Sequence, residues 1–186
     1  SEMCIRDRLY YSGVGLSKNH NLALQWFEQA ADNGHASAHY MLGKIYLNGI
    51  GAMPDIPKAI YHLEKASENG DSSAQAILGQ LYFDGNLIER NFDRAAFLFR
   101  QSAENGNANG QFGLANLYQK GLGVPQDFAE AKRYYEFAAG KGHENAQYNL
   151  ALMFEYGEGV QKNIIKKKLI ARATFNITIL HIKRSV

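Results

Sequence analysis

The chain repeats itself every 36 residues. Glycines separated by that step are Gly34, Gly70, Gly106 and Gly142. A leucine returns in the same frame at Leu42, Leu78, Leu114 and Leu150, and an aromatic ring returns at Tyr46, Tyr82, Tyr118 and Phe154. Repetition with a period of about 20–50 residues is the signature of solenoid folds, in which each copy packs on its neighbours. No other property of the sequence restricts the fold as strongly.

Each unit predicts two helices. In the first, Ala38, Leu42, Ile45 and Tyr46 follow the spacing of an amphipathic helix, and Gly49 ends it because glycine adopts the left-handed conformation without strain. The second helix carries an inward stripe of Ala59, Leu63 and Ala66 and ends at Gly70. Residues able to accept hydrogen bonds from its first-turn amides precede it in every copy: Asp55, Asn91, Asp127 and Asn163.

One such helix pair is too small to bury both of its faces, so neighbouring pairs stack. Small residues let the two helices of a pair approach closely: Gly43, Gly79, Ala115 and Ala151. We therefore predict an all-α fold, an α/α superhelix or solenoid of stacked helix–loop–helix repeats. The repeat array spans 9–161, with a partial unit at 9–34, full units at 35–70, 71–106 and 107–142, and a partial unit at 143–161.

Both ends depart from the frame. Residues 1–8 do not fit it, and we interpret them as a non-native scar. Residues 162–186 form an atypical basic tail, interpreted either as a genuine cap or as a truncated or frame-shifted end, and residues 170–186 are expected to pack poorly. That tail holds seven basic residues and no acidic one, which leaves positions 1–161 with a net charge of −5. A mildly acidic body argues against nucleic acid as a ligand, because phosphate binding needs a concentrated basic face.

The segments AHYMLGKIYLNGIG, GLANLYQKGLGVPQDFAEAKRYYEFAAGKG and AQYNLALMFEYGEGV resemble Sel1-like repeats, relatives of the tetratricopeptide repeat. The Gly-x-Gly loops that carry the resemblance are Gly49–Gly51, Gly121–Gly123 and Gly157–Gly159. The resemblance implies a right-handed superhelix that acts as an adaptor or scaffold in signalling, envelope or protein-quality-control assemblies. One loop departs from the pattern and reads Gly85-Asn86-Leu87, which is expected to reshape one turn without breaking the stack.

No group of residues predicts catalysis. The Gly-x-Gly loops follow helices rather than strands, so they are turns and not phosphate cradles. His35 and His39 have the spacing of a metal pair but no third ligand recurs nearby, and we expect no metal and no cofactor. Secreted cysteine-rich relatives are linked to penicillin binding or β-lactamase activity, and a cysteine-poor relative of these is the rival interpretation. The single Cys4 cannot form an internal disulfide.

The family resemblance places the first helix of each pair on the concave face. Two polar ladders then follow that face, Lys44, Gln80 and Asn116 in one and Asn48, Asp84 and Lys120 in the other. Aromatic rings near the same side are Tyr40, Phe112 and Tyr148. Polar groups with interspersed rings suit an extended peptide, although an ordinary hydrated surface has the same composition.

The sequence thus predicts a protein-interaction scaffold, not an enzyme, that binds a peptide segment or a partner protein. A spacer within a longer chain is the remaining alternative. No apolar run reaches the roughly 20 residues that span a bilayer, no signal peptide opens the chain, and compartment and oligomeric state are left open.

Overall fold

A computed structural model describes residues 19–159 of the chain. Within these residues the structure is all-α, with eight helices of 13 residues each and no strand. The helices are α2 (His20–Asp32), α3 (Ala36–Asn48), α4 (Ile56–Glu68), α5 (Ser72–Asp84), α6 (Phe92–Glu104), α7 (Ala108–Lys120), α8 (Phe128–Gly140) and α9 (Glu144–Tyr156). The predicted fold class is confirmed.

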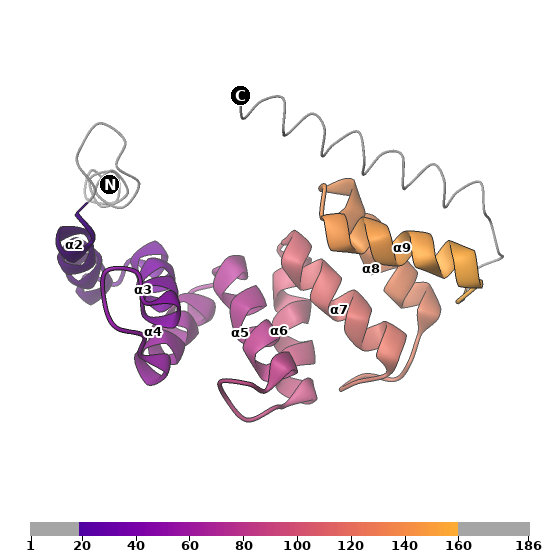
Figure 1. Ribbon diagram of the computed structural model, residues 1–186, viewed down its shortest axis with the longest axis horizontal. Helices are drawn as coiled ribbons and strands as arrows, with labels where there is room; N and C mark the ends of the chain where they lie inside the picture. Colours follow the sequence, from indigo (N-terminus) through magenta and orange to yellow (C-terminus); the bar gives the residue numbers. More distant parts are fainter. Residues whose placement is uncertain (1–18, 160–186) are drawn as a thin grey trace.

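The helices follow one another along a curved array that runs from α2 to α9 (Figure 1). We call α3, α5, α7 and α9 the first helices and α2, α4, α6 and α8 the second helices. Each first helix packs against the second helix on either side of it within the described part of the chain. The first helices also meet one another, since α5 contacts both α3 and α7. Consecutive pairs therefore share one continuous seam, which makes the fold a solenoid.

Side-chain caps begin the second helices, as the sequence predicts. The Asp55 carboxylate accepts a hydrogen bond from the Lys58 amide at 3.0 Å, and Asn91 accepts one from the Arg94 amide at 2.9 Å. Asp127 accepts from two first-turn amides. These bonds satisfy donors that the helix itself leaves without partners. The fourth predicted cap, Asn163, lies outside the described residues.

Glycines end the first helices. The residues that follow α3, α5, α7 and α9 all adopt the left-handed conformation, and these are Gly49, Gly85, Gly121 and Gly157. The second glycine of the loop, as at Gly123, also has a positive φ, and a Cβ there would overlap the backbone of Phe92 at the start of α6. In the loop that departs from the Gly-x-Gly pattern, Leu87 takes the place of the second glycine. Leu87 is 51% exposed, and its φ is not positive. That turn takes another course, and α5 still packs on α6.

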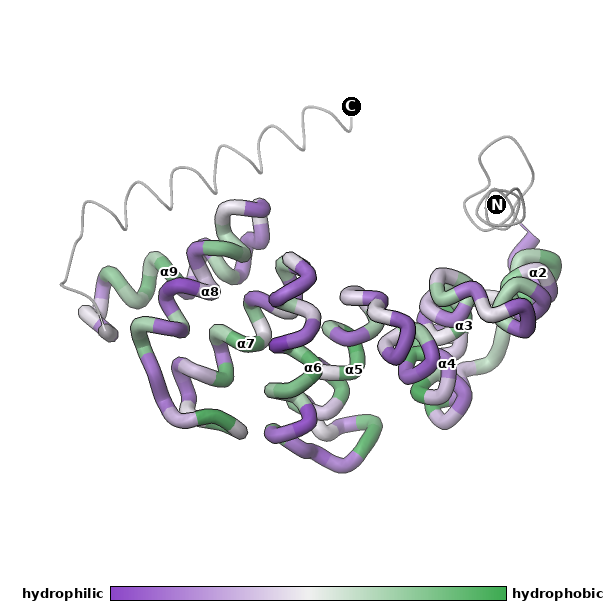
Figure 2. Tube along the Cα trace, turned by 180° about the vertical axis from the view of Figure 1, so that it is seen from behind, coloured by the Kyte–Doolittle hydropathy of each residue, from purple (hydrophilic) through white to green (hydrophobic). Residues whose placement is uncertain are grey.

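The core is the seam between helices. The predicted inward residues of both helix types are buried, with Leu42 and Leu63 fully inaccessible to solvent. Phe99 of α6 lies between two glycines, Gly79 of α5 and Gly113 of α7. A Cβ at either glycine would come within 3 Å of the Phe99 ring, so these helices approach closely because side chains are missing there. Hydrophobic and hydrophilic residues alternate along the helices, as an amphipathic solenoid requires (Figure 2).

The expectations for residues 1–8 and 162–186, including poor packing of 170–186, lie outside the described residues.

Candidate functional site

A cleft opens between the first helices α5 and α7. Two adjoining hollows of about 290 and 210 Å³ form it, and they share Gln80, Phe99 and Phe112 as lining residues. The larger hollow is completed by Ala76, Ile77, Asn109, His143 and Asn145. The smaller one is completed by Phe83, Gly113 and Asn116. We call this combined surface the α5–α7 cleft. It brings together three of the predicted contact residues, namely Gln80, Phe112 and Asn116.

Two small residues account for the depth of the cleft. Ala76 occupies the position that holds Tyr40, Phe112 and Tyr148 in the other units. Gly113 occupies the position that holds Met41, Ile77 and Asn149. Because neither side chain extends over Phe99, the ring of this otherwise buried residue lines both hollows. Neither residue was predicted from the sequence, although the repeat does break its aromatic register at Ala76.

The polar groups of the cleft differ in what they already bind. Nε2 of the exposed Gln80 donates a hydrogen bond to Oδ1 of Asp84, one turn later, at 2.7 Å. Oδ1 of Asn116 lies 2.6 Å from the hydroxyl of Tyr135 and also accepts from Nδ2 of Asn149 at 3.3 Å. Asn116 therefore takes part in the packing between units, whereas Gln80 presents its amide to solvent.

His143 also lines the cleft, and it was not among the residues predicted from the sequence. Its ring stacks on Phe112 with 4.5 Å between centroids and an interplanar angle of 24°. Nδ1 accepts a hydrogen bond from the Ala146 amide at 3.2 Å, so the ring also caps α9. Burial lowers the pKa of His143 below its usual value of 6.5, which favours the neutral ring at neutral pH.

The other predicted contact residues lie along the same set of helices but outside the cleft lining. Nζ of Lys44 lies 5.4 Å from the centre of the Tyr40 ring, and Asn48 donates to the Lys44 carbonyl at 3.0 Å. Lys120 covers the Phe83 ring at 5.6 Å, beside the smaller hollow. Tyr148 on α9 is 64% exposed. These residues lie on α3, α7 and α9, outside the two hollows.

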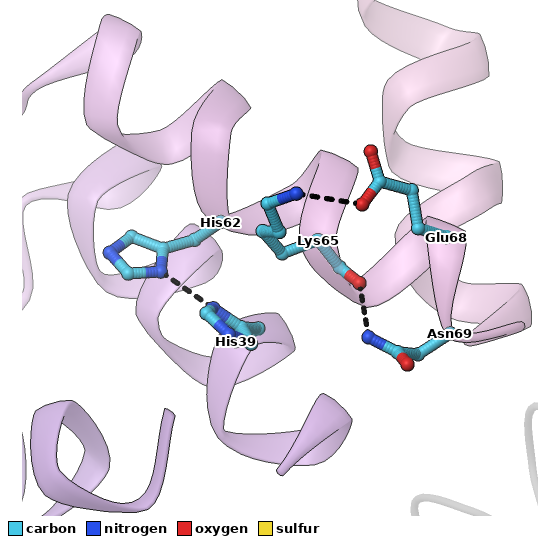
Figure 3. Close-up of polar contacts among 5 residues, drawn as sticks. All are labelled: His39, His62, Lys65, Glu68 and Asn69. Atoms are coloured by element: carbon cyan, nitrogen blue, oxygen red, sulfur yellow. Dashed lines mark hydrogen bonds and ion pairs between the residues drawn. The ribbon is translucent and has the colours of Figure 1, made fainter. Parts of the chain in front are cut away.

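One member of the histidine pair considered as a metal site bonds to a different histidine. Nδ1 of His39 faces Nδ1 of His62 at 2.9 Å, where one ring donates a hydrogen bond and the other accepts it (Figure 3). His35 lies at the start of α3 instead. Between residues 19 and 159 there is no group of three or more His, Cys, Asp or Glu residues able to hold a metal ion. Burial lowers the pKa of both His39 and His62.

In the described range, no helix has both the length and the apolar character needed to cross a membrane.

The model of the Sel1 repeat family matches most of the chain, at residues 2–35, 36–71, 72–107, 108–143 and 145–166. No curated protein sequence matches the chain. Among solved structures it is similar to a Sel1 repeat protein from Oxalobacter formigenes, with 28% identity and a TM-score of 0.86 over 94% of this chain and 71% of that one.

The chain is also similar to a protective antigen of uropathogenic Escherichia coli that displays an SLR fold, with 31% identity and a TM-score of 0.85. That match covers 91% of this chain but only 36% of the antigen. Cysteine rich protein B of Helicobacter pylori is 21% identical, with a TM-score of 0.54 over 69% of this chain and 92% of that one. This last likeness concerns the fold alone, and Cys4, the single cysteine, lies outside the described residues.

Proposed function

Since the chain belongs to the Sel1 repeat family, we propose that it is a protein-interaction scaffold whose first helices receive an extended segment of a partner protein. Sel1 solenoids are commonly scaffolds for protein interactions and are generally not enzymes. The proposal accordingly assigns no catalytic role to any residue. It places the centre of binding at the α5–α7 cleft.

One observation carries this proposal: the cleft combines apolar depth with exposed amides. Phe99 and Phe112 line both hollows, and Gln80 stands between them with its amide in solvent. An amide side chain both donates and accepts hydrogen bonds, as a peptide backbone does. Aromatic rings in a hollow supply the contact area that dominates interface energies. An extended segment therefore finds partners here for both its backbone and its side chains.

The charges beside the cleft support a segment that runs across several units. Lys44 lies on α3, Asp84 on α5 and Lys120 on α7, so charges of alternating sign lie on three successive first helices. Alternating charge fixes the register of a bound segment more than it adds affinity.

The proposal is tested with peptides selected from a displayed random library against the full chain. Their dissociation constants are then measured by fluorescence polarisation for the wild type and for a variant that combines Lys44→Ala, Asn48→Ala, Gln80→Ala and Asp84→Ala. We expect the fourfold variant to bind at least tenfold more weakly while its circular dichroism stays helical.

The matched control removes two exposed rings from the second helices, Tyr61→Ala on α4 and Phe97→Ala on α6, which are 54% and 58% exposed. This control should bind like the wild type. Loss of binding in the control together with full binding by the fourfold variant would move the interaction to the second helices and refute the proposal.

A further inference from the structure

We infer that the α5–α7 cleft selects uncharged apolar side chains, presented by an extended segment, and rejects charged ones. This inference rests on the proposed function and adds the chemistry of the occupant. It concerns a place where the repeat is interrupted, since Ala76 replaces the aromatic residue of the other units.

The described lining of the cleft carries no formal charge. Among residues 19–159, no Asp, Glu, Lys or Arg lines either hollow. The ring of His143, which is titratable, is stacked on Phe112, and burial favours its neutral form. The nearest charged groups, Asp84 and Lys120, lie outside the lining, where one accepts a hydrogen bond from the Gln80 amide and the other covers the Phe83 ring. A charged side chain that enters either hollow would therefore lose water without an opposite charge on the lining itself.

The free energy of leaving water differs between apolar and charged side chains, and this difference decides which of them the cleft binds. Burying apolar surface contributes roughly 25 cal/mol per Å². Burying an ion without an opposite charge is strongly unfavourable, because the neutral amides of the lining replace its hydration only in part. Since Phe99 and Phe112 line both hollows, the cleft offers apolar contact and no ion pair. Discrimination therefore favours aliphatic or aromatic side chains.

The dimensions also fit side chains rather than water alone. Volumes of about 290 and 210 Å³ exceed the share of a single water molecule, roughly 30 Å³, several times over. The hollows adjoin through Gln80 and Phe112. In an extended chain alternate side chains lie on one side, about 7 Å apart. Two such side chains would occupy the two hollows, with the Gln80 amide available to the backbone between them.

Three short probes test the selectivity: N-acetyl-Leu-Gly-Leu-amide, N-acetyl-Glu-Gly-Glu-amide and N-acetyl-Lys-Gly-Lys-amide. Each is titrated into the ¹⁵N-labelled full chain while amide chemical shifts are recorded. We expect the leucine probe to shift amides of α5 and α7 and to bind at least tenfold more tightly than either charged probe. Equal binding of the three probes, or leucine-probe shifts confined to other helices, would overturn the inference.

Ala76→Tyr fills the larger hollow with the kind of residue that the other units carry at this position. Its control is Phe97→Ala on the second helix α6, a ring that is 58% exposed and outside the cleft lining. The leucine probe should lose at least tenfold in affinity for Ala76→Tyr and keep its affinity for Phe97→Ala. Undiminished binding by a helical Ala76→Tyr variant would overturn the inference; if that variant misfolds, the shift map of the wild type decides.

The two proposals fail in different ways. If the selected peptides depend on the first helices but the leucine probe is not preferred, the scaffold function stands and the apolar selectivity is wrong. If the leucine probe fills the cleft but the fourfold variant binds the selected peptides at full strength, the selectivity stands for the cleft and the proposed function is wrong.

Discussion

The unit formed by α3 and α4 and the unit formed by α7 and α8 build the same ring stack from different residues. Tyr46 stacks on His62 with centroids 5.8 Å apart and planes 11° apart. At the equivalent positions two units later, Tyr118 stacks on Tyr134 at 5.9 Å and 8°. A cation covers one ring of each stack, Lys58 over Tyr46 and Arg133 over Tyr134. The repeat therefore fixes where rings lie, but not which chemistry they carry.

The polar interiors of the two units differ more. In the α3–α4 unit, His39 forms a hydrogen bond with His62. The residue after His62, which packs in the seam, is the apolar Leu63. In the other, the residue equivalent to His39 is Gln111, which donates to the Ala103 carbonyl at 3.4 Å. The residue equivalent to Leu63 in this unit is Tyr135, whose hydroxyl lies 2.7 Å from Oε1 of Gln119. One unit thus contains a titratable pair, and the other a set of neutral polar groups.

The largest effect expected concerns the apolar seam of the α3–α4 unit. Leu63→Ala removes a side chain with no solvent exposure that packs against Gly43. Deleting a buried leucine leaves a cavity, and the free energy of unfolding should fall by about 2–5 kcal/mol. Urea denaturation followed by circular dichroism measures the change. A loss below about 1 kcal/mol would show that the seam closes over the gap.

A smaller effect is expected from Tyr135→Phe at the same seam position of the α7–α8 unit. The ring stays buried, but Asn116, Gln119 and Asn149 lose a shared partner. Because these half-buried groups keep other hydrogen bonds, such as the one from Asn149 to Asn116, the loss should be that of an ordinary hydrogen bond, about 0.5–1.5 kcal/mol. Denaturation of this variant beside Leu63→Ala compares the polar seam with the apolar one. A gain in stability would mean that the tyrosine network contributes nothing.

Acid should weaken the α3–α4 unit. Burial is the main cause that lowers the pKa of both His39 and His62. Lys65 lowers the pKa of His39 further, and His39 and Lys58 lower that of His62. Asp32 opposes the shift of both rings, and Glu28 opposes that of His62. In the unfolded chain both rings titrate near 6.5. The unfolded state therefore binds more protons as the pH falls below that value, and the free energy of unfolding decreases with it.

The control for this pH dependence is the double variant His39→Gln with His62→Leu. It carries the residue types that the α5–α6 unit has at the equivalent positions, Gln75 and Leu98. Thermal unfolding from pH 7.5 to pH 5.5 should shift less in this double variant than in the wild type, with His143 accounting for part of what remains. An identical shift in both proteins would contradict a role for the pair.

The smallest effect is expected from the cations over the ring stacks. Arg133 pairs with Glu130 at 2.6 Å and lies 4.7 Å from the centre of the Tyr134 ring, on an exposed surface. Arg133→Ala should lower stability by about 0.5–1 kcal/mol at low salt and less at high salt. Lys58→Ala over Tyr46 is the matched change in the other unit. Losses above about 2 kcal/mol would show that these cations hold the stacks together.

Much of the fold was predictable from local rules. The caps at Asp55, Asn91 and Asp127 and the left-handed glycine at Gly49 follow from sequence patterns that need no knowledge of neighbours. The cleft was only partly predictable. Gln80, Phe112 and Asn116 were selected because they share a helix face, and they do line the cleft. Their binding role remains a prediction.

What was missed depends on contacts between units. Ala76 and Gly113 matter for the space that they leave, and a small side chain in a helix does not indicate by itself whether a neighbour fills that space. His143 enters the cleft because it starts α9 and stacks on a ring of α7. His39 and His62 are 23 positions apart and meet only when α3 packs on α4.

The sequence by itself determined the helices, their ends and the stacking of pairs, because helix periodicity and capping act over a few residues and the 36-residue step repeats them in phase. Only the tertiary structure decided where the array is hollow and which polar groups meet inside it. Those features depend on the volumes and partners of side chains from different helices, which packing alone brings together.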